Sequence, residues 1–339
     1  MKHLFITPVI FFATLVLWLF GSAEASAQQI QIVEAPSGST ITIENGDEGL
    51  TISDGDQILY RNRGNITING HSISYERADD ERRIVGSSER STKTVTLDKG
   101  FNYIKASRGV EVVMSDKKGD EVTISANSNL IDYVICKSSG GTLTVGIDDK
   151  VRSISNFSVV VTIPRCDNVN VYQAASGASI NLHHELTCAN VSMEASSGGS
   201  INCARINCDK LLIAVTSGSN VSGSFRIKQS GIVEASSGAD VTISALSPEL
   251  NLKASSGSTI NASGQVKHLD ADASSAASIK AFNLNAVTAE AEASSGASIK
   301  VNCSKSLEAE ASSAADIRYK GDCSAERSTS SGGSIKKID

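Results

Sequence analysis

Six carboxylates recur in pairs towards the C-terminal end of the sequence, and their oxygens could bind a divalent cation. The pairs are Asp270 and Asp272, Glu290 and Glu292, and Glu308 and Glu310. The members of each pair are two residues apart, so on a β-strand both would point to the same face. Stacked carboxylates repel one another unless cations or basic side chains lie between them, and Ca²⁺ prefers carboxylate oxygens as ligands. The pattern suits a Ca²⁺-binding strip, although we favour the alternative, a solvated face that keeps the protein soluble.

Seven cysteines are the second group that could do chemistry. Five of them precede, by 12 to 14 residues, an aliphatic residue that ends a recurring phrase: Cys166, Cys188, Cys208, Cys303 and Cys323. If the phrase marks stacked units, these five share one corner, with neighbouring Cα atoms about 5 Å apart, which is within disulfide range. Exported proteins fold in an oxidising environment. We therefore expect the disulfides Cys303–Cys323 and Cys188 with either Cys208 or Cys166, with free thiols as the alternative.

Residues that could support catalysis are few. His183 and His184 are adjacent, and the sequence shows no obvious Ser or Cys partner for them, so we expect exposed turn residues. The serines recur in equivalent places and lack the Gly-x-Ser-x-Gly motif of a nucleophile, which indicates architecture. Cys203 is expected to be a buried thiol, and no cysteines have metal-site spacing. The sequence predicts no catalytic residue and no cofactor apart from the Ca²⁺ considered above, and hence no enzyme.

The elements that must position these residues come from one repeated phrase, Ala-Ser-Ser-Gly-x-Ser-Ile, between residues 175 and 335. Its copies end in aliphatic residues 18 to 21 positions apart: Ile180, Ile201, Val221, Val241, Ile260, Ile279, Ile299, Ile317 and Ile335. Apolar and polar residues alternate on both sides of the phrase, as in Val241-Thr242-Ile243, which is strand periodicity. Such a short unit cannot bury its apolar side alone. Stacking about nine units in register predicts a parallel β-solenoid.

The stack predicts rows of equivalent residues. One outward row is Asn181, Asn202, Ser222, Thr242, Asn261, Lys280, Lys300 and Arg318. The glycine of the phrase suits a corner with positive φ. Ala276 and Ala314 replace it in two copies, so either the corner does not demand positive φ or those two coils are strained.

Composition narrows the class of protein further. The chain has 339 residues, of which 4% are aromatic, and a net charge of −6 without a basic tract. A narrow coil has little room for rings, and the charge makes a nucleic-acid partner unexpected. The first residues combine Lys2, an apolar run over 4–20 and the small-residue ending Ala25-Ser26-Ala27. This pattern is typical of a cleavable secretory signal, with an uncleaved membrane anchor as the alternative.

Four segments follow from these patterns. Residues 1–27 are the signal peptide, 28–75 a region of short strands, 76–93 a charged linker and 94–339 the solenoid, with regular coils from 166. Within the second segment, Asn69-Gly70 between alternating runs predicts a hairpin. The fold class is therefore all-β, and no integral membrane span is expected once the signal is cleaved.

The sequence resembles a known bacterial family, the putative auto-transporter adhesin, head GIN domain proteins. The likeness covers roughly 95–320 and is carried by Phe101-Asn102-Tyr103-Ile104, Gly109-Val110-Glu111-Val112, Asn129-Leu130, Gly141-Thr142-Leu143-Thr144-Val145 and the Ala-Ser-Ser-Gly coils. The resemblance implies a β-helix on an exported protein and supplies no catalytic residues. Together with the general chirality preference, it also implies a right-handed coil.

The sequence therefore predicts an exported, adhesin-like, right-handed parallel β-helix that binds through a long polar wall. The compartment could be the periplasm, the cell surface or the medium. The partner is not identified by the sequence; a glycan and a cell-surface or matrix protein are the classes considered. Two alternatives stay open, a carbohydrate-binding or polysaccharide-processing β-helix and a purely structural envelope component.

Overall fold

The computed structural model describes residues 28–32, 41–46, 49–54, 57–62, 66–68, 71–73, 83–97 and 100–338. They belong to two compact units, Met1–Glu81 and Arg82–Asp339. The predicted signal peptide, 1–27, lies outside the described residues. The described secondary structure is strand throughout, except for one 3₁₀ turn, η3 (Ile131–Tyr133). No helix of the described part is long and apolar enough to span a membrane.

The first unit contains two small antiparallel sheets. The larger has the order β1-β2-β3-β4, formed by β1 (Gln28–Ile32), β2 (Ile41–Gly46), β3 (Gly49–Asp54) and β4 (Gln57–Asn62). In the smaller, β5 (Ile66–Ile68) pairs with β6 (His71–Ile73), and Ile68 lies opposite His71. This pairing confirms the hairpin predicted from Asn69-Gly70.

The second unit begins inside the segment that the sequence assigns to a linker. Strand β7 (Arg83–Val85) pairs in parallel with β14 (Ser153–Ser155), and β8 (Arg90–Thr96) pairs antiparallel with β11 (Glu121–Asn127). The linker predicted at 76–93 is therefore wrong from residue 83 onwards. The charged residues form strands here because most side chains of β8 are exposed, so their charges do not interfere with the backbone pairing.

An irregular region precedes the regular coils. Its remaining strands are β9 (Tyr103–Ala106), β10 (Glu111–Met114), β12 (Val134–Ser139), β13 (Thr142–Ile147) and β15 (Val159–Ile163). Strands β12 and β13 pair antiparallel, as do β11 and β15, whereas β9 and β10 each pair in parallel with strands that come later in the chain.

Those parallel pairings make β9 and β10 the first coil of the stack. Strand β9 pairs with β16 (Val171–Ala175), and β10 pairs with the first residues of β17 (Ser179–Ser196). The turn between β9 and β10 contains Arg108 and Gly109, with φ of 61° and 71°. The backbone N–H of Gly109 donates to the carbonyl oxygen of Ser176 at 3.0 Å. The segment 115–170 is therefore an insertion between the first and second coils.

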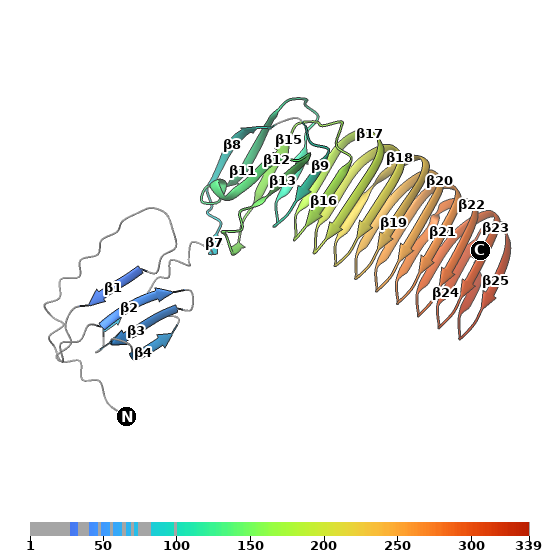
Figure 1. Ribbon diagram of the computed structural model, residues 1–339. Helices are drawn as coiled ribbons and strands as arrows, with labels where there is room; N and C mark the ends of the chain where they lie inside the picture. Colours follow the sequence, from blue (N-terminus) through green and yellow to red (C-terminus); the bar gives the residue numbers. More distant parts are fainter. Residues whose placement is uncertain are drawn as a thin grey trace. The chain divides into compact units, whose positions relative to one another are not determined.

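The regular coils follow as long strands stacked in parallel, one per turn of the solenoid (Figure 1). They are β18 (Ser200–Val215), β19 (Asn220–Ala235), β20 (Asp240–Ala254), β21 (Thr259–Ala273), β22 (Ser278–Ala293) and β23 (Ser298–Ala311). The next turn is divided into two shorter strands, β24 (Asp316–Lys320) and β25 (Ser324–Thr329), which pair with the two ends of β23, and β26 (Ser334–Lys337) pairs with β24. The predicted parallel β-solenoid is thus confirmed.

Each coil turns sharply at its copy of the phrase, where two successive residues have positive φ. In the copy at 256–257, Ser256 has φ of 51° and Gly257 of 70°. The N–H of Gly257 donates to the carbonyl oxygen of Ser275, in the turn of the next coil, at 3.0 Å. Ala276 and Ala314 adopt the same conformation, with φ of 59° and 60°. The corner therefore does demand positive φ, and the two alanine coils are strained.

The core is a column of small aliphatic side chains between the two walls of each coil. The predicted closing residues from Ile180 to Ile317 are all at most 1% exposed, and only Ile335, in the last coil, is partly exposed. A row of alanines, represented by Ala254 at 4% exposure, lets the opposite strands approach closely. The scarcity of aromatic residues follows from this narrow cross-section.

Candidate functional site

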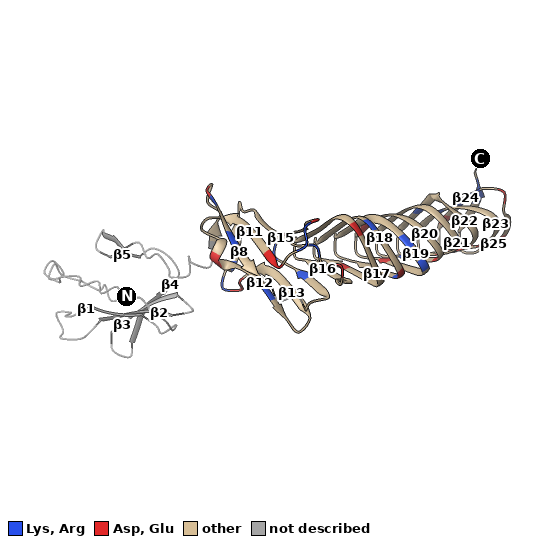
Figure 2. Cartoon of the chain, turned by 90° about the horizontal axis from the view of Figure 1, so that it is seen from above, with Lys and Arg blue, Asp and Glu red and all other residues tan. Residues whose placement is uncertain are grey.

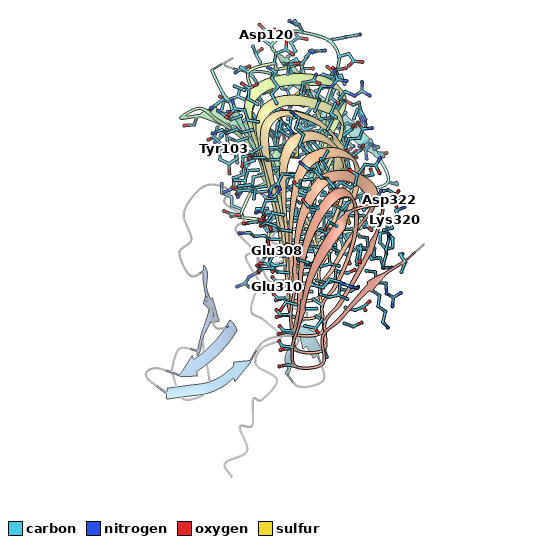
Figure 3. All side chains as sticks on the ribbon, turned by 90° about the vertical axis from the view of Figure 1, so that its right-hand side faces the viewer. Tyr103, Asp120, Glu308, Glu310, Lys320 and Asp322 are labelled. Carbon is cyan, nitrogen blue, oxygen red and sulfur yellow. The ribbon has the colours of Figure 1, made fainter. Side chains whose placement is uncertain are left out.

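Each long strand bends between two turns, so its two halves form opposite walls of the solenoid, and both walls are polar outside. We call the half that follows a turn the leading wall and the half that precedes the next turn the trailing wall. The outward row predicted from Asn181 to Arg318 is in register along the leading wall. Figure 3 shows Glu308 and Glu310 of the trailing wall on one side of the coil and Lys320 of the leading wall on the other.

The first coils of the leading wall carry a ladder of hydrogen-bonded side chains. The Asn181 amide donates to Glu111 Oε1 at 2.8 Å, and the Asn202 amide donates to Asn181 Oδ1 at 3.0 Å. The Ser222 hydroxyl then donates to Asn202 Oδ1 at 2.8 Å. Each group satisfies its neighbour in the next coil, so this part of the wall is internally bonded and offers few free polar groups to a ligand.

The later coils of the leading wall carry positive charge. Lys280, Lys300 and Arg318 are consecutive partners in register. Arg318 is paired, because its Nε lies 2.8 Å from Asp316 Oδ2. The Nζ atom of Lys300 lies 5.8 Å from the centre of the Phe282 ring. The predicted outward row is thus polar at one end and basic at the other, and Figure 2 marks the charged positions along the ribbon.

The six predicted carboxylates do stack on the trailing wall, in two rows of three. Asp270, Glu290 and Glu308 are partners in successive strands, and so are Asp272, Glu292 and Glu310. No group of three or more His, Cys, Asp or Glu residues in the described part of the chain is arranged to hold a metal ion. Ca²⁺ binding by this strip therefore stays a prediction, for which calorimetric titration with Ca²⁺ is the direct test.

Burial, with a smaller effect of the stacked neighbours, shifts the proton affinity of two of these carboxyls. Burial, followed by the charge of Glu290, raises the pKa of Asp270 above its usual range, although the Asn251 amide donates to Asp270 Oδ2 at 2.5 Å. Burial, followed by the charges of Asp272 and Glu310, raises the pKa of Glu292. Burial and mutual repulsion therefore favour protonation of these two carboxyls, while Lys253 and His268 offset part of the negative charge around Asp270.

The first coils of the trailing wall are different in character. The Tyr103 hydroxyl donates to Gln173 Oε1 at 2.5 Å, and the Gln173 amide donates to Glu194 Oε2 at 3.1 Å. Leu212 and Ile232, which are partners in register, are 40% and 41% exposed. This stretch combines bonded polar groups with two exposed aliphatic side chains.

The predicted disulfides around Cys188 are not formed, because all seven cysteines are free. Cys188 and Cys208 do lie opposite each other in β17 and β18, as the column predicted. The Cys188 thiol, however, donates to the carbonyl oxygen of Val169 at 3.4 Å. The Cys166 thiol likewise donates to the carbonyl oxygen of Pro164 at 3.2 Å. These sulfurs are directed at backbone acceptors, which is why stacking alone does not bring them into a bond.

The predicted Cys303–Cys323 disulfide is also absent. The Cys303 thiol donates to the carbonyl oxygen of Ser306 at 3.0 Å. Burial raises the pKa of Cys303, and the neighbouring Cys323 sulfur adds to the effect. Cys203 is a half-buried thiol whose pKa burial raises to about 12. The thiols of Cys303 and Cys203 are therefore held in their protonated form at neutral pH.

The expectation of exposed turn residues is wrong about the turn for both histidines and wrong about exposure for His184. Both lie on strand β17 and not in a turn, with His183 exposed and His184 only 8% exposed. His184 Nδ1 is 3.4 Å from Asp116 Oδ1, yet neither ring nitrogen has a hydrogen-bond partner among the described residues. Burial, followed by the charge of Arg165, lowers the pKa of His184. The alternation Ile180, Leu182 continues to His184, and this signal could have placed the ring inside.

Phe282 is the surface residue that the sequence patterns missed. It borders a hollow of about 430 Å³ on the leading wall, together with Lys280 and Lys300. The irregular spacing of the closing residues around it, 20 residues from Ile279 to Ile299 and then 18, is the signal that could have indicated a local bulge.

Comparison with known proteins gives one family and several solved structures. Residues 100–247 and 222–323 match the family model described as putative auto-transporter adhesin, head GIN domain. No curated protein matches the chain. A putative adhesin from Parabacteroides merdae is similar with a TM-score of 0.58 and 17% identity, over 76% of this chain and 100% of that one.

Two further solved structures come from Parabacteroides distasonis. One is a putative adhesin with a TM-score of 0.53 and 17% identity, over 76% of this chain and 100% of that one. The other is a putative lipid binding protein with a TM-score of 0.45 and 20% identity, over the same shares of the two chains. At these identities the two adhesin structures support the fold alone.

Proposed function

Because this chain belongs to the putative auto-transporter adhesin, head GIN domain family, we propose that it is an exported, adhesin-like protein that binds its partner through the walls of the solenoid and does not catalyse a reaction. The observation that carries the proposal is the in-register stacking of outward polar residues over successive coils. On the leading wall this row extends from Asn181 to Arg318. Such a surface repeats the same spacing many times, which suits an extended or repetitive partner.

Export is part of the proposal and rests on the N-terminal pattern. Lys2, the apolar run over 4–20 and the Ala25-Ser26-Ala27 ending are typical of a cleavable secretory signal. The family description, an adhesin, agrees with a location outside the cytoplasm. Expression of the full chain in a bacterial host, followed by fractionation and N-terminal sequencing, is expected to give an exported chain that begins at Gln28.

Binding by the purified mature chain is the central test. We expect the fluorescently labelled chain to bind at least one class among glycan arrays, matrix proteins and intact cells, with saturation. Absence of binding to all three would contradict the proposal and favour a purely structural role. Release of soluble oligosaccharides from a panel of polysaccharides would also contradict the proposal, because such a product would indicate a polysaccharide-processing enzyme.

A further inference from the structure

Phe282 is an aromatic side chain that the regular coils leave at the surface. From residue 166 onwards the described chain contains three other aromatic residues, and all are buried: Tyr172, Phe225 and Tyr319 are at most 4% exposed. Phe282 is half-buried. A ring left partly in water in a fold with so few rings calls for a physical explanation.

The local register explains why this ring points outwards. Ala281 lies opposite Val301, but the next pair along the same two strands is Asn285 with Asn302, so residues 282–284 have no partners in the next coil. Leu284 fills the core and is fully buried. The bulge therefore displaces Phe282 to the surface and opens a hollow beside it.

Two lysines lie over the ring and a third, Lys280, borders the same hollow, all without a carboxylate partner among the described residues. The Nζ atoms of Lys300 and Lys320 lie 5.8 Å and 5.6 Å from the centre of the Phe282 ring. Lys280 precedes Lys300 in the basic row. Within the described residues, none of the three has a carboxylate oxygen within ion-pair distance, in contrast to Arg318. The ring thus holds two ammonium groups whose charge is uncompensated by the protein.

The remaining lining of the hollow is made of hydroxyl and amide groups. Thr242, Asn261, Ser263 and Asn283 border it, while Ile243 is buried beneath it. The side chains of Asn261, Asn283 and Thr242 form no hydrogen bond with the described part of the chain. At the other end of the same wall the equivalent asparagines are bonded to one another. The free donors and acceptors therefore concentrate where the lysines and the ring are.

We propose that this hollow is a subsite for an acidic polysaccharide, which deepens the proposed adhesive function and rests on it. A pyranose ring has an apolar C–H face that packs on the Phe282 ring, and its hydroxyls need donors and acceptors such as Asn261 and Asn283. A carboxylate or sulfate on the sugar binds the ammonium groups of Lys300 and Lys320. A lipid does not fit as well, because Phe282 is the one apolar side chain in the lining that is not buried.

The carboxylates of a second copy of this chain are the competing occupant. The trailing wall carries Asp270, Glu290 and Glu308 at the same coil spacing as the basic row. A wall of carboxylates matches the charge of the lysines but brings no ring to Phe282 and no hydroxyls to the free amides. A charged sugar therefore offers a partner to the lysines, to the Phe282 ring and to the free amides, whereas a second copy offers one only to the lysines. The experiment distinguishes these two occupants.

The test uses the mature full chain with three probes: oligogalacturonate, dextran sulfate and neutral dextran. Calorimetry at about 0.15 M salt limits long-range charge effects. We expect binding to oligogalacturonate or dextran sulfate, which distinguishes carboxylate from sulfate as the preferred group, and no binding to dextran. Phe282→Ala and Lys300→Gln should each weaken binding at least about tenfold, the loss of one good contact. Lys253→Gln, on the trailing wall, is the matched control and should leave binding unchanged.

Several results would overturn the subsite. Equal binding by wild type and Phe282→Ala would mean that charge alone attracts the polymer. Binding of neither acidic polymer would remove the inference, and so would concentration-dependent self-association that Lys300→Gln abolishes. If the chain binds cells or matrix proteins but neither acidic polymer, the proposed function stands and the subsite falls. If it binds nothing, both fall. Circular dichroism of each variant checks that the solenoid is intact.

Discussion

The backbone N–H of Ala276 donates to the carbonyl oxygen of Ser295, one coil further along, at 3.0 Å. This bond requires Ala276 to adopt the left-handed conformation, with φ of 59°, at a position where neighbouring coils carry glycine. An L-residue with a Cβ pays about 1 kcal/mol in that region. The hydrogen bond to the neighbouring coil thus helps to hold Ala276 in a backbone conformation that alanine does not favour.

Replacing Ala276 by Gly is expected to stabilise the protein by about 1 kcal/mol, because the left-handed conformation costs glycine little. Ala314→Gly should act in the same way, since Ala314 has φ of 60°. Urea denaturation of the variants measures the change. The matched control is Gly257→Ala, where no atom lies within 4 Å of the added Cβ and the backbone penalty acts alone. An unchanged or lower midpoint for Ala276→Gly would show that the turn is unstrained.

Acidification is expected to destabilise the fold through His184. Burial lowers its pKa below the ordinary value of 6.5, so the unfolded chain binds the proton more readily than the folded chain. The contribution of neutral His184 is complete above that value and is lost as the pH falls below it. Urea midpoints at about pH 8 and about pH 5 should therefore differ less in His184→Gln than in wild type. The exposed neighbour His183 provides the control, His183→Gln, which should behave like wild type.

The cysteines are expected to be seven free thiols, and two of them, Cys203 and Cys136, are expected to react slowly. Burial raises the pKa of Cys203 to about 12, and that of Cys136 to about 11. Only the thiolate is alkylated, so both residues should react far more slowly at neutral pH than a model thiol. Mass spectrometry after alkylation in denaturant should count seven thiols without reduction. A lower count that reduction restores would show that a disulfide forms after all.

Removing one charge from the acidic strip is expected to stabilise the protein at neutral pH. Glu292 has a raised pKa, because burial and then Asp272 and Glu310 disfavour its ionised form. Its ionisation therefore costs stability as the pH rises through the folded pKa, and the penalty is absent at lower pH, where the group is protonated. Glu292→Gln should raise the thermal midpoint at neutral pH and have little effect below about pH 4. High salt should reduce the gain, and a gain that is equal in high salt would argue against charge repulsion.

Much of the fold could be predicted because every copy of the repeat shows the same strand alternation and the same turn. The alternation around Ile180 and Val241 identified the strands and the inward row, and the spacing of the closing residues identified the stack. The first coil was harder to place. Ala106-Ser107-Arg108-Gly109 follows the phrase, but Arg replaces its second serine and the insertion at 115–170 separates it from the other copies. The parallel pairings of β9 with β16 and of β10 with β17 show that it belongs to the column.

Part of the candidate site depends on local departures from the sequence repeat, which the repeat itself cannot predict. The carboxylate rows were predictable, because strand alternation fixes their face. The hollow beside Phe282 was not, since it arises where three residues bulge out of register between β22 and β23. The predicted disulfides are not formed. Spacing did place cysteines of neighbouring coils beside one another, but it does not show what each sulfur binds, and the Cys303 thiol donates to the carbonyl oxygen of Ser306 with the Cys323 sulfur as its neighbour.

The ladder of turns also determines how the rod responds to mechanical load. Each turn is bonded to the next one, as Gly257 is to Ser275, and every coil contacts mainly its two neighbours. Tension applied to one end therefore acts on the terminal coil first, and the rod should yield coil by coil, each step releasing about 65 Å of extended chain. A solenoid built in this way lengthens under force while its inner coils stay folded, so an applied load is absorbed in steps and not in a single unfolding event.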